Sequence, residues 1–323
     1  MKGESARFYD LVVVGHLVID YTISHIEQRV ALGGPPAYAM VARSLGLEHV
    51  GLVTVIGSDF PDEYFQQLVN AGLNLEGVRR GRITTRFTNR YFEDKERVQQ
   101  ATAVADSIDI SDFPSDYWKT KWMNFSPILQ EIDPKMIILA KQRGAIVTVD
   151  IQGYVRCRNP NQDNRVKPCP WKDFPEVAVN IDVLKADIDE ISRLTSLSNI
   201  RKASQSAYAA GCKIILITDG QRGSYIYYND NLHTIPALPP QRTIDPTGCG
   251  DIFNISFMIE YQRTNRPLWS AYFAATSASF NIETPGPTDF PTHKQVTARL
   301  NRFLKQPKNL HHHEILRKEK EDS

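Results

Sequence analysis

Short apolar runs rich in β-branched residues alternate with helical stretches along most of the chain. Most of these runs are followed by a glycine or an aspartate, and prolines and glycines mark the beginnings and ends of the first helices. The predicted strands are 11–14, 51–56, 122–125, 146–149, 181–184 and 214–218. The predicted helices are 35–45, 60–71, 134–142, 188–195 and 200–210. Apolar strands that alternate with helices predict an α/β fold: a Rossmann-like, mostly parallel central sheet with helices on both faces.

Two stretches, about 21–32 and 83–105, lack helical periodicity and place Thr, Val, Phe and Tyr in near-alternation. We expect them to form strands outside the main sheet, as a small β flap or lid, with a hairpin turn at Glu93–Glu96. A second hairpin is predicted around the turn at 229–231, and 156–175 is expected to be irregular.

The organisation predicted is one domain over 9–305, followed by a polar C-terminal tail at 306–323. The tail carries His311–His313 and ends in alternating charges. Three histidines could bind a metal, but a solvated and partly disordered terminus is the interpretation we favour.

Composition narrows the class of protein. The chain has 323 residues, 41% of them hydrophobic, with 38 Lys plus Arg against 37 Asp plus Glu, for a net charge of +1. This balance argues against nucleic-acid binding and against an anionic membrane surface. Apolar runs are too short to span a bilayer, and the first residues show no signal peptide. We expect a soluble, cytoplasmic protein that acts as a monomer or homodimer on a small molecule.

The four cysteines lack the spacing of a zinc site or of a disulfide framework. Cys157, Cys169, Cys212 and Cys249 are therefore expected to behave as isolated small hydrophobes.

The segment Asp245–Asp251 is the most informative for chemistry. A proline turn leads to Gly248, Cys249 and Gly250, and an apolar helix follows. Free N–H groups and the helix dipole at such a start stabilise an anion. Asp251, in the first turn, is placed to take a proton from a hydroxyl that attacks a phosphoryl group. An ordinary glycine-rich turn is the alternative.

Several motifs recur in the same order in a known family. The chain has Gly15–Asp20 after the first strand, the pair Gly33–Gly34 before a helix, Gly57–Asp59 after a later strand, and the Asp245–Asp251 segment. In these features it resembles the ribokinase-like (PfkB) family of carbohydrate and nucleoside kinases, from about Asp10 to Leu304. The resemblance implies an ATP- and Mg²⁺-dependent kinase that phosphorylates a hydroxyl of a small polyol or sugar.

The resemblance also implies roles for individual residues. Asp251 is the catalytic base, and Gly248, Cys249 and Gly250 form the anion hole. Asp187 and Glu190 stand where the family has N-x-x-E and are expected to organise magnesium. The expected nucleotide contacts are Thr218, Asp219, Gly220, Gly223, Thr247, Gly248, Gly250 and Asn281, although packing explains Asn281 nearly as well.

The expected substrate contacts are Asp20, Gly33, Gly34, Tyr38, Arg97, Asp150 and Arg156. An ion pair with a carboxylate would explain Arg156 about as well as a substrate contact would. An arginine on an exposed strand, such as Arg97, more commonly lies at the surface without a substrate contact. His16 is expected to have a positional role beside Asp20 and not to act in acid–base catalysis.

The acceptor is less defined. Val18 and Tyr38 replace asparagines common in the family, and the motifs look closest to an archaeal branch that includes myo-inositol kinases. Myo-inositol is therefore the first expectation. A nucleoside kinase, with Tyr38, Phe87 or Tyr91 as a platform for the base, is the second. A non-catalytic polyol-binding protein on the same scaffold is the third.

Overall fold

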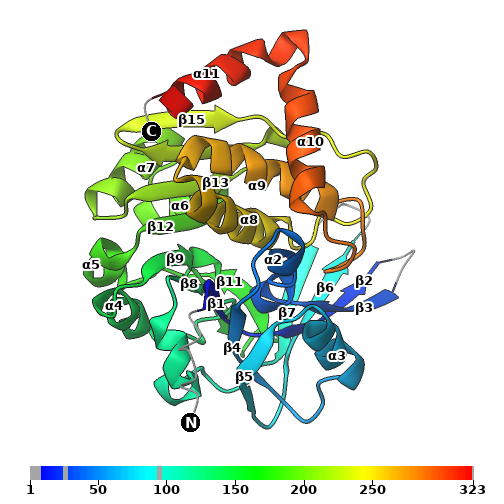
Figure 1. Cartoon of the computed structure of the whole chain (residues 1–323). Coiled ribbons are helices and arrows are strands. Elements are labelled where there is room, and N and C mark those ends of the chain that lie inside the picture. Colours follow the sequence, from blue (N-terminus) through cyan, green and yellow to red (C-terminus); the bar gives the residue numbers. More distant parts are fainter. Residues whose placement is uncertain (1–8, 25–27, 93–96, 322–323) are drawn as a thin grey trace, which may run out of the picture.

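The computed structural model describes residues 9–24, 28–92 and 97–321, and the side chains of Tyr91 and Arg97 lie outside this description. Its main body is a nine-stranded sheet in the order β15-β14-β13-β12-β9-β8-β1-β4-β5 (Figure 1). The strands from β13 to β5 run parallel, and the hairpin β14–β15 is added antiparallel. The strands are β1 (Leu11–Val14), β4 (Val50–Ile56), β5 (Asn74–Arg80), β8 (Trp122–Phe125), β9 (Ile146–Asp150), β12 (Val183–Asp187), β13 (Ile214–Thr218), β14 (Ser224–Tyr228) and β15 (Asn231–Ile235). The predicted α/β class is confirmed.

Helices cover both faces of this sheet, because alternate side chains of each buried strand point to opposite sides. Leu11 and Val13 of β1 join one hydrophobic core, and Val12 and Val14 join the other. On the first side lie α1 (Pro35–Tyr38), α2 (Val41–Ser44), α3 (Asp62–Asn70), α8 (Cys249–Thr264), α9 (Pro267–Asn281), α10 (His293–Leu304) and α11 (Leu310–Glu321). On the second side lie α4 (Lys135–Gln142), α5 (Phe174–Val177), α6 (Ile188–Thr195) and α7 (Ile200–Ala209).

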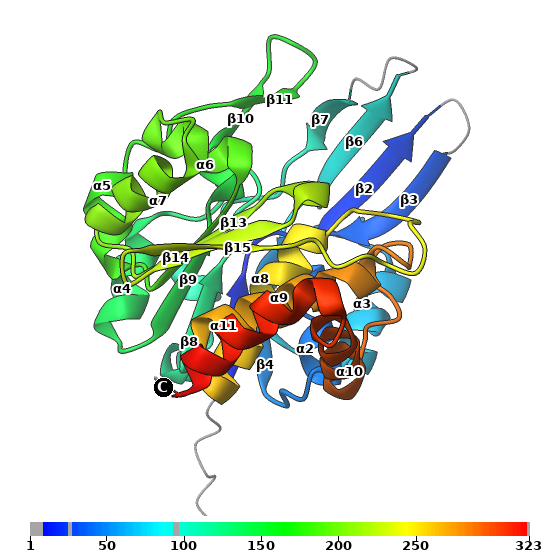
Figure 2. The ribbon, with the colours of Figure 1, turned by 90° about the horizontal axis from the view of Figure 1, so that it is seen from above.

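A second, six-stranded sheet forms the flap, in the order β10-β11-β7-β6-β2-β3. Figure 2 shows its strands projecting beyond the edge of the main body. The strands are β2 (Val18–Ile23), β3 (Gln28–Gly33), β6 (Thr85–Tyr91), β7 (Arg97–Ala103), β10 (Arg156–Asn159) and β11 (Arg165–Pro168). The predicted flap is confirmed, while its predicted turn at Glu93–Glu96 lies outside the described residues. The flap has a small apolar core of Val18, Phe87, Ala101 and Ile128.

The segment 156–175 is not irregular as expected, because it supplies the hairpin β10–β11 to the flap. This pairing sets Cys157 opposite Lys167 and brings Cys157 to Cys169. The two form a disulfide with an S–S distance of 2.10 Å and a Cα–Cα distance of 5.8 Å. The expectation of four isolated cysteines was therefore wrong for this pair, whereas Cys212 and Cys249 are free thiols.

The C-terminal segment is also more ordered than expected. Residues 310–321 form helix α11, whose Leu316 is buried against the main core. The Glu319 carboxylate accepts hydrogen bonds from the backbone N–H groups of Leu268 and Trp269, at 2.6 and 3.0 Å. It thereby caps the first turn of α9, where a negative charge is favourable. The polar sequence of 310–321 therefore belongs to a surface helix that buries one side against the protein, and not to a disordered tail.

Among the described residues, no helix is both long enough and apolar enough to span a bilayer.

Candidate active site

A cleft of about 1050 Å³ lies between the flap and the carboxyl ends of the parallel strands. Asp187 ends β12 and Thr218 ends β13, and both side chains line this cleft together with Asp20 of β2. Ligands of open α/β sheets bind outside the carboxyl ends of the strands, so this is the expected location of a site.

The first turn of α8 forms the floor of the cleft. Gly248 precedes the helix with a φ of 76°, a left-handed conformation that favours glycine. A Cβ at Gly248 would lie only 1.9 Å from Cζ of Tyr38, so the tyrosine ring packs directly on this backbone. The turn is fixed by Asp245, whose Oδ1 accepts from the Thr247 N–H at 2.9 Å and whose Oδ2 pairs with Arg29 of the flap.

Asp251 lines the cleft in this first turn, as the sequence predicts. Burial, and next the nearby Asp150 carboxylate, raise the pKa of Asp251 to about 7, against the lowering effect of Lys185. The Gln152 side chain donates to Asp251 Oδ1 at 3.4 Å. A carboxylate with a pKa near neutrality is suited to accept a proton from a hydroxyl.

Asp150 does not reach the cleft wall, where it was expected to contact substrate. Its side chain is fully buried, and Oδ2 lies 2.8 Å from Lys185 Nζ. The two residues are register partners on the parallel pair β9–β12. Lys185 itself lines the cleft and was missed by the sequence analysis. A signal was present, because a lysine inside the otherwise apolar run 183–186 needs a buried partner.

Asp187 and Glu190 form a capping box at the start of α6. The Asp187 side chain accepts from the Glu190 N–H at 2.7 Å, and Glu190 Oε2 accepts from the Asp187 N–H at 2.7 Å. Glu190 Oε1 pairs with Arg156 at 2.9 Å, and the Glu190 side chain is only 1% exposed.

This arrangement bears on the expected magnesium site. If Glu190 bound magnesium directly, it would lose its ion pair with Arg156. Asp187 and Glu190 are therefore not equivalent as candidate magnesium ligands. No group of three or more His, Cys, Asp or Glu side chains within 9–24, 28–92 and 97–321 is arranged to hold a metal. Magnesium that arrives with phosphates needs only one or two carboxylates, and Asp187 lines the cleft.

At the flap end, Asp20 is the centre of a polar group. A Cβ at Gly33 would lie 2.1 Å from Asp20 Oδ2, so the glycine leaves space for this carboxylate. Asn89 donates to Asp20 Oδ1 at 3.5 Å, and Gln99 donates to Asn89 at 3.0 Å. Phe87 of the flap and Ile128 add apolar surface to the same wall.

Tyr38 and Gly34 also line the cleft. The Tyr38 hydroxyl is buried without a hydrogen-bond partner in the described part of the chain. Burial, and next Asp251, raise the pKa of Tyr38 well above its ordinary value, so the phenol stays protonated.

His16 lies outside the cleft lining. It is buried, with Nδ1 2.9 Å from Thr85 Oγ1 and Nε2 3.0 Å from the Asp106 carbonyl oxygen. The position of the Arg97 side chain lies outside the described residues.

At the other end, the expected nucleotide residues separate into two groups. Residues that line the cleft are Thr218, Gly220, Gly223, Thr247, Gly248 and Gly250. Asp219 instead pairs with Arg222 at 2.5 Å, and Asn281 donates to the Thr247 carbonyl at 2.8 Å. These two side chains hold the loops and do not line the cleft. An apolar wall that the sequence analysis missed includes Leu238, Pro239, Pro240, Phe253, Ala275 and Ile282.

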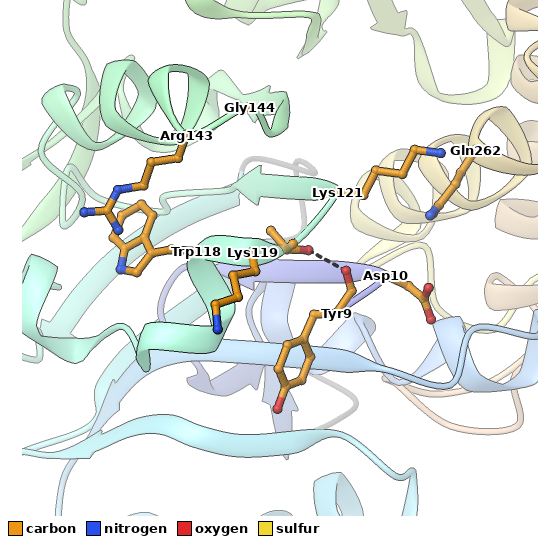
Figure 3. A pocket seen from close by; sticks show the side chains of 9 residues that line it. Tyr9, Asp10, Trp118, Lys119, Lys121, Arg143, Gly144 and Gln262 are labelled. Carbon is orange, nitrogen blue, oxygen red and sulfur yellow. Dashed lines mark hydrogen bonds between the residues drawn. The ribbon is translucent and has the colours of Figure 1, made fainter. Parts of the chain in front are cut away.

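A second hollow, of about 620 Å³, lies at the opposite, amino ends of β1, β8 and β9 (Figure 3). Arg143 stacks over the Trp118 ring at 4.3 Å, and Lys119 and Lys121 are nearby. Thr120 Oγ1 donates to the Tyr9 carbonyl at 3.0 Å. Asp10 is the acidic residue of its lining, and the hollow is remote from the glycine-rich turn of α8.

Comparison with known proteins identifies the family. Residues 9–294 match the pfkB family carbohydrate kinases. The chain belongs to this family. It is a phosphotransferase that uses a hydroxyl group as acceptor, and the predicted ribokinase-like fold and kinase class are confirmed.

A cytidine kinase from Thermococcus kodakarensis is 31% identical over 266 residues, covering 80% of this chain and 90% of that protein. A nucleoside kinase from Methanothermobacter thermautotrophicus is 27% identical over 312 residues, covering 86% of this chain and 90% of that protein. Among solved structures, a pyrophosphate-dependent ribokinase-family kinase with a pyrophosphate analogue and myo-inositol superposes with a TM-score of 0.75. That structure is 20% identical and covers 89% of this chain and 99% of its own, so it bears on the fold alone.

Proposed function

We propose that this kinase transfers the terminal phosphate of ATP to a hydroxyl of a nucleoside, with a pyrimidine nucleoside such as cytidine as the preferred acceptor. The observation that carries the proposal is the composition of the flap wall. It combines one carboxylate, Asp20, with the amides of Asn89 and Gln99 and the apolar surface of Phe87 and Ile128.

Each part of this wall suits a part of a nucleoside. One carboxylate can accept hydrogen bonds from two neighbouring ribose hydroxyls. Side-chain amides can both donate to and accept from the polar edge of a base, and an aromatic ring offers a stacking face. The similarity to a cytidine kinase and a nucleoside kinase supports the same acceptor class.

In the proposed arrangement, ATP lies along 218–223 and 245–251. Its adenine would contact the apolar wall described above, and magnesium, bound with the phosphates and near Asp187, would neutralise their charge. Asp251 takes the acceptor's proton, and the N–H groups at the start of α8 stabilise the transferred group. Asp251 has the raised pKa that this role needs.

Myo-inositol, the first expectation from sequence, remains the competing acceptor. A polyol has hydroxyls around its whole ring and would use Asp20 and the amides but not the apolar surface. The likeness to a kinase complexed with myo-inositol concerns the fold and does not identify the acceptor here.

An acceptor panel tests the proposal. Cytidine, uridine, adenosine, ribose and myo-inositol are each incubated with ATP, magnesium and the purified chain, and the phosphorylated product is measured directly. We expect kcat/KM for the best nucleoside to exceed that for myo-inositol by about tenfold or more, as differences of ~1.4 kcal/mol in transition-state binding produce. A preference for myo-inositol or free ribose would refute the nucleoside assignment.

A further inference from the structure

The interior of the main sheet holds a charged side chain that neither the family motifs nor the proposed function uses. Lys185 lies in the middle of β12 and is 5% exposed. Its neighbours Leu184 and Ala186 join the core on the α4–α7 side, and Val183 joins the core on the α8 side. Side chains alternate along a strand, so Lys185 points toward α8.

The Lys185 ammonium group lies at the start of α8. A Cβ added to Gly250 would be 3.1 Å from Lys185 Nζ, and both residues line the cleft. The Asp150 carboxylate, which is fully buried, lies 2.8 Å from the same ammonium group. Lys185 therefore contacts a buried carboxylate and also lies beside the backbone that would receive the phosphate.

The charge on this group is maintained. Burial alone would lower the pKa of Lys185, but the carboxylates of Asp150, Glu190 and Asp251 raise it above its usual range. Lys185 therefore stays an ammonium ion and acts through its positive charge.

A purely structural ion pair explains this position less well. Two buried charges often contribute less to stability than two well-packed apolar residues would, so such a pair needs another reason to be there. Lys141 and Lys213 also pair with a buried carboxylate, that of Asp182, but none of these three residues lines the cleft. Lys185, by contrast, lines the cleft.

We propose that Lys185 is a catalytic residue whose ammonium group completes the anion-binding site at the first turn of α8 and contacts the transferred phosphoryl group. Backbone N–H groups offer only partial positive charges, and Lys185 adds a full one. Charge spreads over the three outer oxygens of the phosphoryl group during transfer, so a fixed ammonium beside them lowers the barrier.

The step balances without a proton from Lys185. The acceptor oxygen forms a bond to the terminal phosphorus of ATP, and the bond from that phosphorus to the bridging oxygen breaks. The bridging electron pair leaves on ADP, and the acceptor's proton passes to Asp251. The ammonium keeps its three protons throughout and supplies charge and hydrogen bonds only.

The test compares Lys185→Met, Lys185→Arg and the double variant Lys185→Met/Asp150→Asn. The double variant removes both charges, so no uncompensated carboxylate stays buried. In the wild type the Gln152 N–H donates to Asp150 Oδ1 at 3.1 Å, and the asparagine retains an oxygen that can accept this hydrogen bond. Lys141→Met is the matched control, because it removes a lysine from a buried carboxylate outside the cleft. Steady-state kinetics are measured on the alkaline plateau of the pH profile, with thermal unfolding to confirm folding.

We expect kcat to fall by about 10²–10³-fold in Lys185→Met, as on loss of one donor to a transition-state anion. The double variant should stay as slow, Lys185→Arg should recover part of the rate, and Lys141→Met should match the wild type. If Lys185→Met does not fold, the double variant carries the comparison. A double variant within about threefold of wild type would overturn the proposal and reduce Lys185 to a partner for Asp150.

The proposal concerns the transfer step and rests on the proposed function only for the choice of acceptor. The kinetics use whichever acceptor the wild-type chain phosphorylates best. A preference for an acceptor other than a nucleoside would refute the proposed function and leave the Lys185 comparison intact.

Discussion

At the scale of single residues, Asp251 shows how burial sets chemistry. An exposed aspartate is almost fully ionised near neutrality and is a weak base. Burial in the cleft, with Asp150 close by, raises the pKa of Asp251 to about 7. The carboxylate then has a stronger affinity for the proton that it must accept, while part of the population is still ionised at neutral pH.

The pH dependence of the reaction follows from this value. Asp251 works as a base only when ionised, so kcat/KM for the acceptor, which reports the pKa of the free enzyme, should rise with pH and reach half of its plateau near pH 7 on the acid side. Asp251→Asn should lower kcat by about 10²–10⁴-fold and remove this acid limb, with little change in ATP affinity. A pH series of initial rates, with ATP affinity by calorimetry, measures both effects.

The control is Asp10→Asn, at the opposite end of the sheet in the second hollow. It should leave rate and pH profile unchanged. An Asp251→Asn enzyme that keeps near-normal turnover would exclude Asp251 as the base.

Sequence reasoning placed Asp251, Asp20 and the glycines of the α8 turn in the cleft because local motifs carry them. It misplaced Asp150 and did not single out Lys185, since their pairing depends on the register of β9 against β12. Asp219 and Asn281 were assigned to the nucleotide, whereas both hold loops through short contacts. Spacing shows that a residue is near a site, but not which way its side chain points.

At the scale of elements, short and mostly apolar buried strands were the easiest to predict. The bounds of β1, β8 and β13 and of helix α6 agree with the sequence prediction, since each is a short run with a clear beginning and end. The hairpin β10–β11 was missed because its prolines, asparagines and charges are typical of loops. Its residues become strands through pairing with β7 in the flap.

The disulfide of this hairpin gives a test at the same scale. Cys157 and Cys169 are bonded, so the unfolded protein should titrate two thiols without reductant and all four after reduction. Closing a loop of this length is worth about 3 kcal/mol in the chain-entropy account, and reduction should therefore lower the unfolding temperature. Thiol titration and thermal unfolding, each with and without reductant, make the measurement.

The variant Cys157→Ser/Cys169→Ser serves as the control, since reductant should not change its unfolding temperature. Four reactive thiols in the unreduced, unfolded wild type would show that the bond is not formed in solution.

At the scale of the whole molecule, an ion pair joins the flap to the nucleotide end of the cleft. Arg29 of β3 pairs with Asp245, which also fixes the turn before α8. The second oxygen of Asp245 additionally accepts from the Gly286 N–H at 3.3 Å. The flap therefore contacts the same turn that holds the anion-binding N–H groups, and acceptor binding on the flap can affect that turn.

This connection predicts how the kinase keeps ATP from water. A flap seated on the acceptor excludes water from the terminal phosphate, and enzymes commonly couple such closure to substrate binding. Arg29→Met should raise the KM for the acceptor by about tenfold or less and increase ADP release in the absence of acceptor. Arg79→Met is the matched control, because Arg79 pairs with the buried Asp112 away from the cleft. Rates of ADP release with and without acceptor separate phosphoryl transfer to the acceptor from ATP hydrolysis by water. If the ratio of these two rates in Arg29→Met equals the wild-type ratio, this ion pair does not link the flap to the transfer site.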